Sequence, residues 1–220
     1  MNLGPHFVIV LGPPAAGKST LGRSLLAGNP RLYQFVVAHE LDVEKHNDTA
    51  LWRAMARFAE RGAWIPDALV LELFAQRLCE HHTTGMLLHG LPANGTQAVM
   101  LRDLIETCTE SAPVVLYLDA PDDVCLLRVH ERRVCTRCGD GKTAVSPIPT
   151  APGRCGSCGA VCTRRDDDAE AVFVERLQAH RDNAPAILAA FAPDEVVVLD
   201  ATRAPATVSA MAKVALGGGE

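Results

Sequence analysis

The stretch Gly12–Thr20, GPPAAGKST, constrains the fold of this 220-residue chain more than any other. It follows the apolar run Phe7–Gly12 (FVIVLG) and opens a helical pattern over Lys18–Leu26. It fits G-x-x-x-x-G-K-[ST] in full, in the strand–loop–helix context that this motif requires. The alternative is a glycine-rich turn that binds nothing, and it leaves the agreement of strand, loop and helix unexplained.

A loop of this kind binds the phosphates of a nucleotide. Its backbone N–H groups surround the β-phosphate, Lys18 reaches the β- and γ-phosphates, and the Ser19 hydroxyl binds Mg²⁺. We therefore predict an ATP site with Lys18 as a catalytic residue and Ser19 as the magnesium ligand. The loop residues of this site are Gly12, Pro13, Pro14, Ala15, Ala16, Gly17, Lys18, Ser19 and Thr20.

Apolar β-rich runs alternate with helical patterns along the rest of the chain. Buried parallel strands are predicted at Phe7–Gly12, Gly85–Gly90, Val114–Ala120 and Val196–Asp200, with a weaker fifth at Gln34–Ala38. Helices are predicted at Lys18–Leu26, Asp42–Glu60, Pro66–His81, Gln97–Cys108, Pro121–Arg132, Asp168–Phe191 and Pro205–Ala215. This alternation predicts an α/β fold with a doubly wound parallel sheet.

Residues 134–164 interrupt the alternation and contain little that could form an apolar core. They hold two C-x-x-C pairs, CTRC and CGSC, and thiolates at this spacing close a tetrahedral zinc site. We predict structural zinc on Cys135, Cys138, Cys155 and Cys158, with metal binding supplying the folding free energy of the segment. A redox C-x-x-C pair is the rival interpretation. Cys162 is either inert or a substitute ligand, and the remaining cysteines, Cys79, Cys108 and Cys125, are predicted to lie in the core.

Composition excludes several classes of protein. Hydrophobic residues make up 48% of the chain, which argues against disorder, and the net charge of −5 without a basic tract argues against nucleic acid as a partner. The apolar run near the N-terminus is too short for a signal or membrane segment. We therefore expect a cytoplasmic, monomeric protein with no membrane partner, whose cysteines are thiols or metal ligands.

The predicted strand at Gly85–Gly90 ends in a turn, within the sequence LLHGLPANGTQA (residues 87–98). The end of a parallel strand usually faces a ligand, yet the side chains here include no cation that could hold a phosphate. Elsewhere, Arg128 and Arg132 are four residues apart on one predicted helix face. Taken alone, that pair could be a solvated charged surface.

Taken together, the phosphate loop, the cysteine pairs and the arginines resemble the adenylate kinase family in its long form with a zinc-bearing lid. The resemblance runs from GPPAAGKST through LLHGLPANGTQA, YLDAPDD and RVHERRVC to CTRRDDD, and so covers almost the whole chain. It implies a P-loop nucleotide-kinase fold, with a five-stranded parallel sheet flanked by helices and a zinc-ribbon-like lid. The implied division is core 1–35, acceptor-binding lobe 36–66, core 67–133, lid 134–164 and core 165–220.

The resemblance also implies roles for single residues. Arg128, Arg132, Arg165 and Arg176 fall at the positions that clamp ATP and the transferring phosphoryl group, with Arg164 as an alternative to Arg165. Gly62 in ERGAWIPDAL matches a family glycine, and Gln97 matches the residue that reads the adenine edge of the monophosphate. The implied acceptor-binding residues are His39, Asp42, Ile65, Gly90, Ala93 and Gln97.

Departures from the family cluster on the acceptor side. The family's DGFPRT reads HGLPAN here, so His89 replaces an aspartate that helps to arrange Mg²⁺, and Ala93 replaces an arginine that grips the acceptor phosphate. The family's TGDMLR aligns to VAHELD, so Asp42 replaces a second such arginine. Losing two charge-assisted contacts removes roughly 3–6 kcal/mol of binding free energy, unless Arg53 or Arg57 substitutes.

We therefore expect an ATP-dependent phosphotransferase whose acceptor is a small nucleoside or similar hydroxyl compound. A nucleoside-monophosphate kinase with a rewired phosphate grip is the first alternative, and a catalytically inactive ATP sensor is the second. A hydroxyl acceptor needs a general base. Asp42 is the first candidate, although it could merely cap the helix predicted to begin there, and the rival bases are His39, Glu40 and His89.

Overall fold

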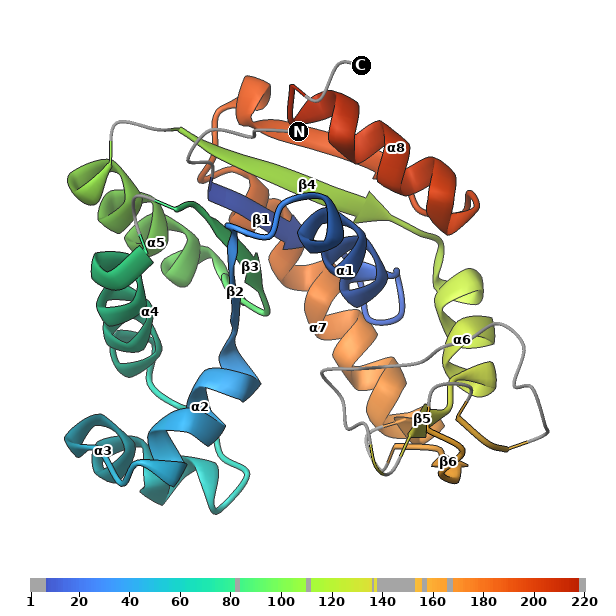
Figure 1. Ribbon diagram of the computed structural model, residues 1–220, viewed down its shortest axis with the longest axis horizontal. Coiled ribbons are helices and arrows are strands. Elements are labelled where there is room, and N and C mark those ends of the chain that lie inside the picture. The colour runs from blue at the N-terminus through green and yellow to red at the C-terminus, as the bar shows by residue number, and fades with distance from the viewer. Residues whose placement is uncertain are drawn as a thin grey trace.

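A parallel sheet forms the centre of the computed structural model (Figure 1). The structure describes residues 7–81, 84–109, 112–135, 137, 153–155, 158–165 and 168–217. Within these residues the sheet has five strands in the order β2-β3-β1-β4-β7, and every neighbouring pair is parallel. The strands are β1 (Phe7–Leu11), β2 (Tyr33–Val36), β3 (Met86–His89), β4 (Pro113–Asp119) and β7 (Val196–Asp200).

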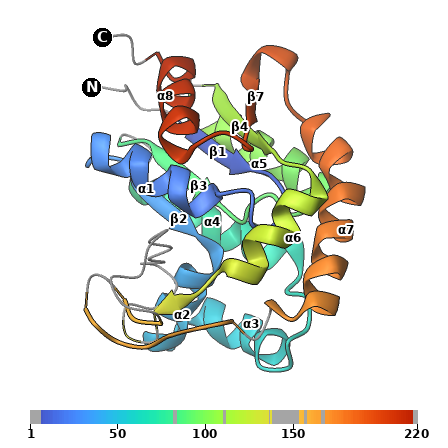
Figure 2. The same ribbon diagram turned by 90° about the vertical axis from the view of Figure 1, so that its right-hand side faces the viewer.

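Helices cover both faces of this sheet, as Figures 1 and 2 show. Helices α1 and α8 contact each other, while α5 contacts both α4 and α7. The predicted α/β fold with a five-stranded parallel sheet is therefore confirmed. The helices are α1 (Lys18–Gly28), α2 (Val37–His46), α3 (Ala50–Ala59), α4 (Asp67–His81), α5 (Gly95–Cys108), α6 (Asp122–Glu131), α7 (Glu170–Leu188) and α8 (Pro205–Ala215), with a short 3₁₀ turn at Pro193–Glu195.

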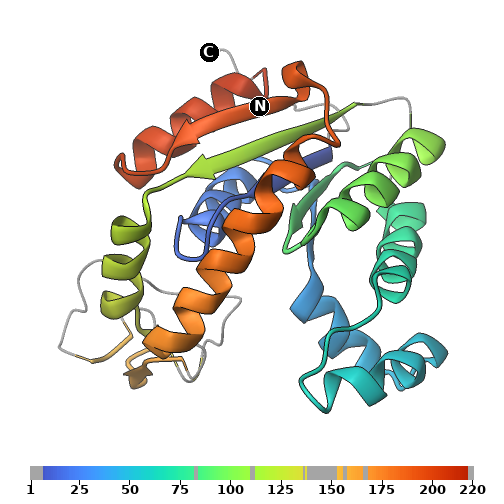
Figure 3. The same ribbon diagram turned by 180° about the vertical axis from the view of Figure 1, so that it is seen from behind.

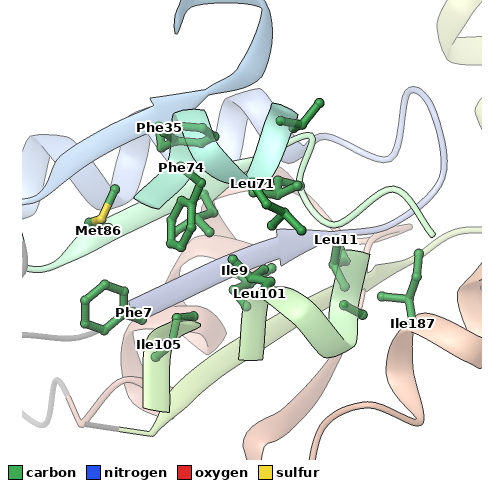
Figure 4. Close-up of a cluster of buried hydrophobic side chains, with 14 of the residues drawn as sticks. Phe7, Ile9, Leu11, Phe35, Leu71, Phe74, Met86, Leu101, Ile105 and Ile187 are labelled. Carbon is green, nitrogen blue, oxygen red and sulfur yellow. The ribbon is translucent and has the colours of Figure 1, made fainter. Parts of the chain in front are cut away.

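The period of two along β1 divides the core between the two faces. Phe7, Ile9 and Leu11 join the cluster that α4 and α5 cover, part of which Figure 4 shows. Val8 and Val10 join the opposite cluster, with side chains from α1 and α8. A strand that is buried on both faces reads as a continuous apolar run, and this is why β1 could be recognised in the sequence.

The helix predicted over Asp42–Glu60 is wrong, because two helices occupy the region. Helix α2 begins at Val37, and the chain turns through Asp48, whose φ is +45°. Helix α3 then begins with its own cap, the Thr49 hydroxyl oxygen, which accepts a hydrogen bond from the Trp52 backbone N–H at 3.0 Å. Asp42 therefore lies inside α2 and does not cap a helix.

Two predictions of burial also need correction. Strand β7 was predicted to be buried, but it lies at an edge of the sheet and is only partly covered: Leu199 is buried, whereas Val198 is exposed. Cys79 and Cys108 are exposed on α4 and α5, whereas Cys125 is buried as predicted. Both exposed thiols lie near the C-terminal ends of their helices, on faces that point away from buried neighbours such as Leu78 and Ile105.

Two small substructures extend from the core, as Figures 1 and 3 show from opposite sides. One is the pair α2–α3, reached from β2. The other is the antiparallel pair β5 (Val134–Cys135) and β6 (Cys162–Thr163), which lies between α6 and α7 in the sequence. Among the described helices, none combines the length and the apolar character that crossing a membrane would need.

Candidate active site

The loop between β1 and α1 has the backbone form of a phosphate cradle. Gly12, Ala15 and Gly17 all have positive φ, at 136°, 63° and 107°. Gly12 cannot be replaced without movement, because a Cβ there would lie 2.5 Å from the carbonyl oxygen of Leu118 on β4. The loop therefore packs tightly against β4. The first turn of α1 carries Lys18 and Ser19, and the Ser19 side chain is exposed.

Lys18 folds back over its own loop. Its Nζ donates hydrogen bonds to the carbonyl oxygens of Gly12 at 2.6 Å and Pro13 at 2.7 Å. Burial of the ammonium and the positive charges of Arg176 and Arg132 lower the pKa of Lys18 to about 8. The positive charges of Arg176 and Arg132 are therefore felt at Lys18, and a bound polyphosphate would stabilise the charged form of this ammonium.

Arg128 lies on α6 and Arg132 is the first residue after it, and the two have different partners. Arg128 donates to the carbonyl oxygen of Ala16 in the phosphate loop at 3.3 Å, and to that of Ala201 at 2.6 Å. Arg132 forms a bidentate ion pair with the fully buried carboxylate of Asp168. The distance from Nε to Oδ2 is 2.9 Å. The first joins the loop to the end of β7, and the second joins α6 to the segment before α7.

Arg164, Arg165 and Arg176 follow the β5–β6 pair. Arg164 donates to the backbone carbonyl oxygen of Asp168 at 3.2 Å, so its guanidinium turns back onto its own segment. Arg165 is half-buried. Arg176 is exposed on α7, close enough to Lys18 to lower the pKa of that ammonium.

His89 ends β3 and faces α1. Its side chain is buried, and its Nε2 has no hydrogen-bond partner among the described residues. A Cβ built on Gly22 would lie only 2.3 Å from that nitrogen, so the imidazole fills the space that Gly22 leaves on α1. Burial and the charge of Lys18 lower the pKa of His89 to about 4, and the ring is therefore neutral at pH 7.

Helix α2 has two glutamates on its buried face, and its opposite face is exposed to solvent. Glu40 and Glu44 are buried and bind Arg77 of α4, with nitrogen–oxygen distances of 2.8 Å and 2.5 Å. Glu40 also accepts a hydrogen bond from the Tyr33 hydroxyl at 2.8 Å. His39 and Asp42 lie on the exposed face of the same helix. The structure thus places Glu40 in an internal ion pair and leaves Asp42 open to solvent.

The turn after β3 is held by a network around Asp67, the first residue of α4. Gln97 is buried; its Nε2 donates to Asp67 Oδ1 at 2.7 Å, and its Oε1 accepts from the backbone N–H of Ala93 at 2.7 Å. Asn94 caps α5 and donates to the same carboxylate at 3.2 Å. Both ends of the Gln97 amide therefore hold the turn. Of the other implied acceptor residues, Gly90 is exposed, and Ile65 packs at the margin of the core.

The two arginines that could replace the missing phosphate grip already have neighbours. Arg53 binds the carboxylate of Asp48 through Nε at 3.2 Å and a terminal nitrogen at 2.8 Å, in an exposed pair. The guanidinium of Arg57 lies 4.7 Å from the ring centroid of Phe58. An exposed pair is weak, so a ligand could displace it.

Three of the four predicted zinc ligands meet in the β5–β6 region. The sulfur atoms of Cys135, Cys155 and Cys158 lie within 4.8 Å of one another, and Cys135 and Cys155 are buried. The backbone N–H of Arg137 points at the Cys135 sulfur at 3.4 Å. Cys138 lies outside the described residues. Cys162 pairs with Cys135 across the two strands, so it lies beside the cluster.

Two residues near the site were missed from the sequence. His180 of α7 stacks on Tyr117, with Nε2 3.3 Å from the Tyr117 hydroxyl, and burial and the charge of Lys18 lower its pKa to about 4. His180 lies one helical turn after Arg176, and this spacing of four residues could have indicated that both side chains lie on the same face of the helix. Trp64 is the other, and its side chain is 64% exposed in the connection between α3 and α4.

Comparison with known proteins agrees with this geometry. The family model described as "Adenylate kinase" matches residues 10–196. An adenylate kinase of Syntrophobacter fumaroxidans is 31% identical over 176 residues, which cover 80% of this chain and 82% of that protein. An adenylate kinase of Treponema pallidum is 32% identical over 82% of this chain and 83% of its own. One of Thermotoga neapolitana is 29% identical, with 83% of each chain covered.

Proposed function

Since the chain belongs to the adenylate kinase family and is an ATP-dependent phosphotransferase, we propose that it transfers the γ-phosphoryl group of ATP to a nucleoside monophosphate. Its relatives are named adenylate kinases, which favours this acceptor over the hydroxyl compound that the sequence departures suggested. Family membership also favours an enzyme over an inactive sensor.

The observation that carries the proposal is the lack of a prepared general base on the acceptor side of the described structure. A hydroxyl must lose its proton as it is phosphorylated, whereas a monophosphate oxygen is already ionised. Glu40 is bound to Arg77 and Tyr33. His89 is neutral, faces α1 and, with a pKa of about 4, is a weak base at pH 7. His39 and Asp42 are exposed on α2. The Nδ1 of His39 lies 3.6 Å from the carboxylate of its neighbour Glu40, and no hydrogen bond or ion pair with another described residue orients Asp42.

Catalysis would then rest on positioning and charge neutralisation, which phosphoryl transfer mainly requires. Lys18 would leave the carbonyl oxygens of Gly12 and Pro13 for the β- and γ-phosphates of ATP. Arg128, already on the loop carbonyl of Ala16, would position the nucleotide. Arg132, Arg165 and Arg176 would neutralise charge on the transferring group. The exposed Ser19 hydroxyl would hold Mg²⁺, which shields the phosphates.

A hydroxyl acceptor remains the second candidate, because Asp42 and Ala93 stand where arginines would hold a phosphate. One assay separates the two acceptors. The enzyme is given Mg·ATP with AMP, CMP, GMP or UMP and, in parallel, with the four matching nucleosides, and products are resolved by chromatography. We expect nucleoside diphosphates, with a high KM because the phosphate grip is weak. Faster conversion of nucleosides to monophosphates would reject the proposal.

We also propose that Cys135, Cys155 and Cys158, with Cys138 as the fourth thiolate, hold a structural zinc ion. The three sulfur atoms already lie within 4.8 Å of one another, and a cluster of thiolates is the donor set that zinc prefers in structural sites. The sequence of residues 134–164 contains little that could form an apolar core, so the metal would supply much of the stability of this segment.

The purified protein is expected to contain about one zinc ion per chain. The double variant Cys135→Ser/Cys158→Ser should lose nearly all of it and become more susceptible to proteolysis within residues 134–164, because two of the ligands are gone. Metal content is measured by mass spectrometry. Cys79→Ser/Cys108→Ser, which changes two exposed thiols outside the cluster, is the matched control. Full zinc content in the first variant would contradict the ligand assignment.

A further inference from the structure

We propose that Cys162 is a reserve ligand of the zinc site, able to take the fourth position in place of Cys138. The inference rests on the zinc site proposed above and adds to it a residue outside the two C-x-x-C pairs. The segment then has five thiols for the four positions that a structural zinc ion offers. The fourth position is shared between Cys138 and Cys162.

The strand pairing places Cys162 beside a predicted ligand. Cys135 on β5 and Cys162 on β6 are opposite each other in the antiparallel pair, so their side chains leave the same face with Cβ atoms about 4.5–5.5 Å apart. The Cys162 thiol forms a hydrogen bond with Cys135. Two sulfur ligands of one tetrahedral zinc ion, each about 2.3 Å from the metal, lie roughly 3.8 Å apart. A thiol in contact with Cys135 is therefore close to the separation that two ligands of one ion require.

The backbone also joins Cys162 to the other half of the site. Its N–H donates to the carbonyl oxygen of Gly153 at 2.8 Å, and the N–H of Cys155 donates to the carbonyl oxygen of Ala160 at 2.8 Å. An isolated β-bridge lies between these two hydrogen bonds. Cys162 is thus held by β5 on one side and by the backbone next to Cys155 on the other. Its sulfur can approach the cluster by a side-chain rotation, without movement of the backbone.

The sulfur positions make Cys162 a reserve ligand and not a fixed one. The sulfur atoms of Cys135, Cys155 and Cys158 all lie within 4.8 Å of one another, and Cys162 is not part of that group. Three thiolates leave one position of a four-coordinate zinc ion to be filled. Cys162 contacts a member of the group, and Cys138, three residues after Cys135, competes for the same position.

The first test counts thiolate ligands with cobalt(II), which occupies tetrahedral thiolate sites and absorbs more strongly with each thiolate bound. The full-length protein is stripped of metal and titrated with cobalt(II). We expect Cys138→Ser and Cys162→Ser each to keep the four-thiolate spectrum of the wild type, and Cys138→Ser/Cys162→Ser to show that of three thiolates. Cys138→Ser/Cys79→Ser, which loses instead an exposed thiol of α4, is the matched control and should resemble Cys138→Ser.

Zinc affinity is a second measurement on the same variants, made by competition with a chelator. We expect Cys138→Ser to bind zinc within about tenfold of the wild type, because Cys162 takes the open position. The variant Cys138→Ser/Cys162→Ser should bind it on the order of a hundredfold to a thousandfold more weakly, the share of one ligand in four. Thermal melting checks that each variant is folded.

The outcomes separate this inference from the proposals around it. Four thiolates in the wild type but three in Cys138→Ser would overturn the role of Cys162 and leave the zinc site intact. Four thiolates in Cys138→Ser/Cys162→Ser would also overturn it, because another group would then fill the position. A wild type that binds neither metal would reject the zinc site, and the role of Cys162 with it. Neither measurement involves ATP or an acceptor, so the proposed phosphoryl transfer is tested separately.

Discussion

Replacing Asp42 and Ala93 together by arginine is expected to lower the KM for a nucleoside monophosphate by roughly two to four decades. Each new guanidinium can form a charge-assisted hydrogen bond with the acceptor phosphate, and such a bond contributes about 1.5–3 kcal/mol. The change at position 42 also removes a carboxylate that repels a dianion. Asp42 is exposed on α2, and Ala93 lies in the turn after β3, so longer side chains can be accommodated toward solvent.

The measurement is steady-state kinetics with AMP, at low and at moderate salt. Asp42→Asn is the informative partial variant, because it removes the repulsion without adding a cation, and its effect should be much smaller. Glu72→Arg, which makes the same charge change as Asp42→Arg but on an exposed position of α4, should leave the KM unaltered. Added salt should reduce the gain, since it screens exposed charges. An unchanged KM in the folded double variant would mean that neither position faces the acceptor phosphate.

The parts of the fold that could be predicted are those encoded locally. Strand β1 is buried on both faces and reads as an uninterrupted apolar run, and the loop after it carries a motif whose spacing is typical of phosphate-binding loops. The division between α2 and α3 was missed because it depends on Asp48 in a left-handed conformation and on the Thr49 cap. Both residue types are common at turns and helix caps, but the apolar pattern on either side is continuous and outweighed this signal.

The contacts of His89 and Gln97 join distant parts of the chain, and for that reason they could not be predicted. His89 was read as an unusual residue at a strand end, but its position depends on Gly22, which leaves room on α1 for the ring. Gln97 was assigned by resemblance to the base edge, yet in the structure its amide binds Asp67, 30 residues earlier. In both cases the residue was noticed in the sequence, and the distant residue that it contacts was not.

Lys18→Ala is expected to reduce kcat/KM for phosphoryl transfer about 10²–10³-fold or more, the loss typical of removing one preorganised donor to a developing charge. The ammonium is the group of the phosphate loop that can reach the β- and γ-phosphates, and no other residue of Gly12–Thr20 carries a positive charge. Turnover is measured at saturating and at low ATP. Lys213→Ala, a lysine at the end of α8, is the matched control. Turnover equal to wild type would remove the loop from the mechanism.

The same lysine predicts a pH dependence with a definite sign. Its pKa in the unliganded protein is lowered from 10.5 to about 8, chiefly by burial and then by Arg176, so the free enzyme loses the ammonium as the pH rises through 8. ATP favours the charged form, and the KM for ATP should therefore rise between about pH 8 and 10. In this window the unfolded chain binds more protons than the folded one, so the contribution of Lys18 to stability rises with pH. Lys18→Arg keeps its charge over the whole range; it should show a poorer KM near pH 7 that changes little with pH. A KM for ATP that stays flat to pH 9.5 in the wild type would contradict the lowered pKa.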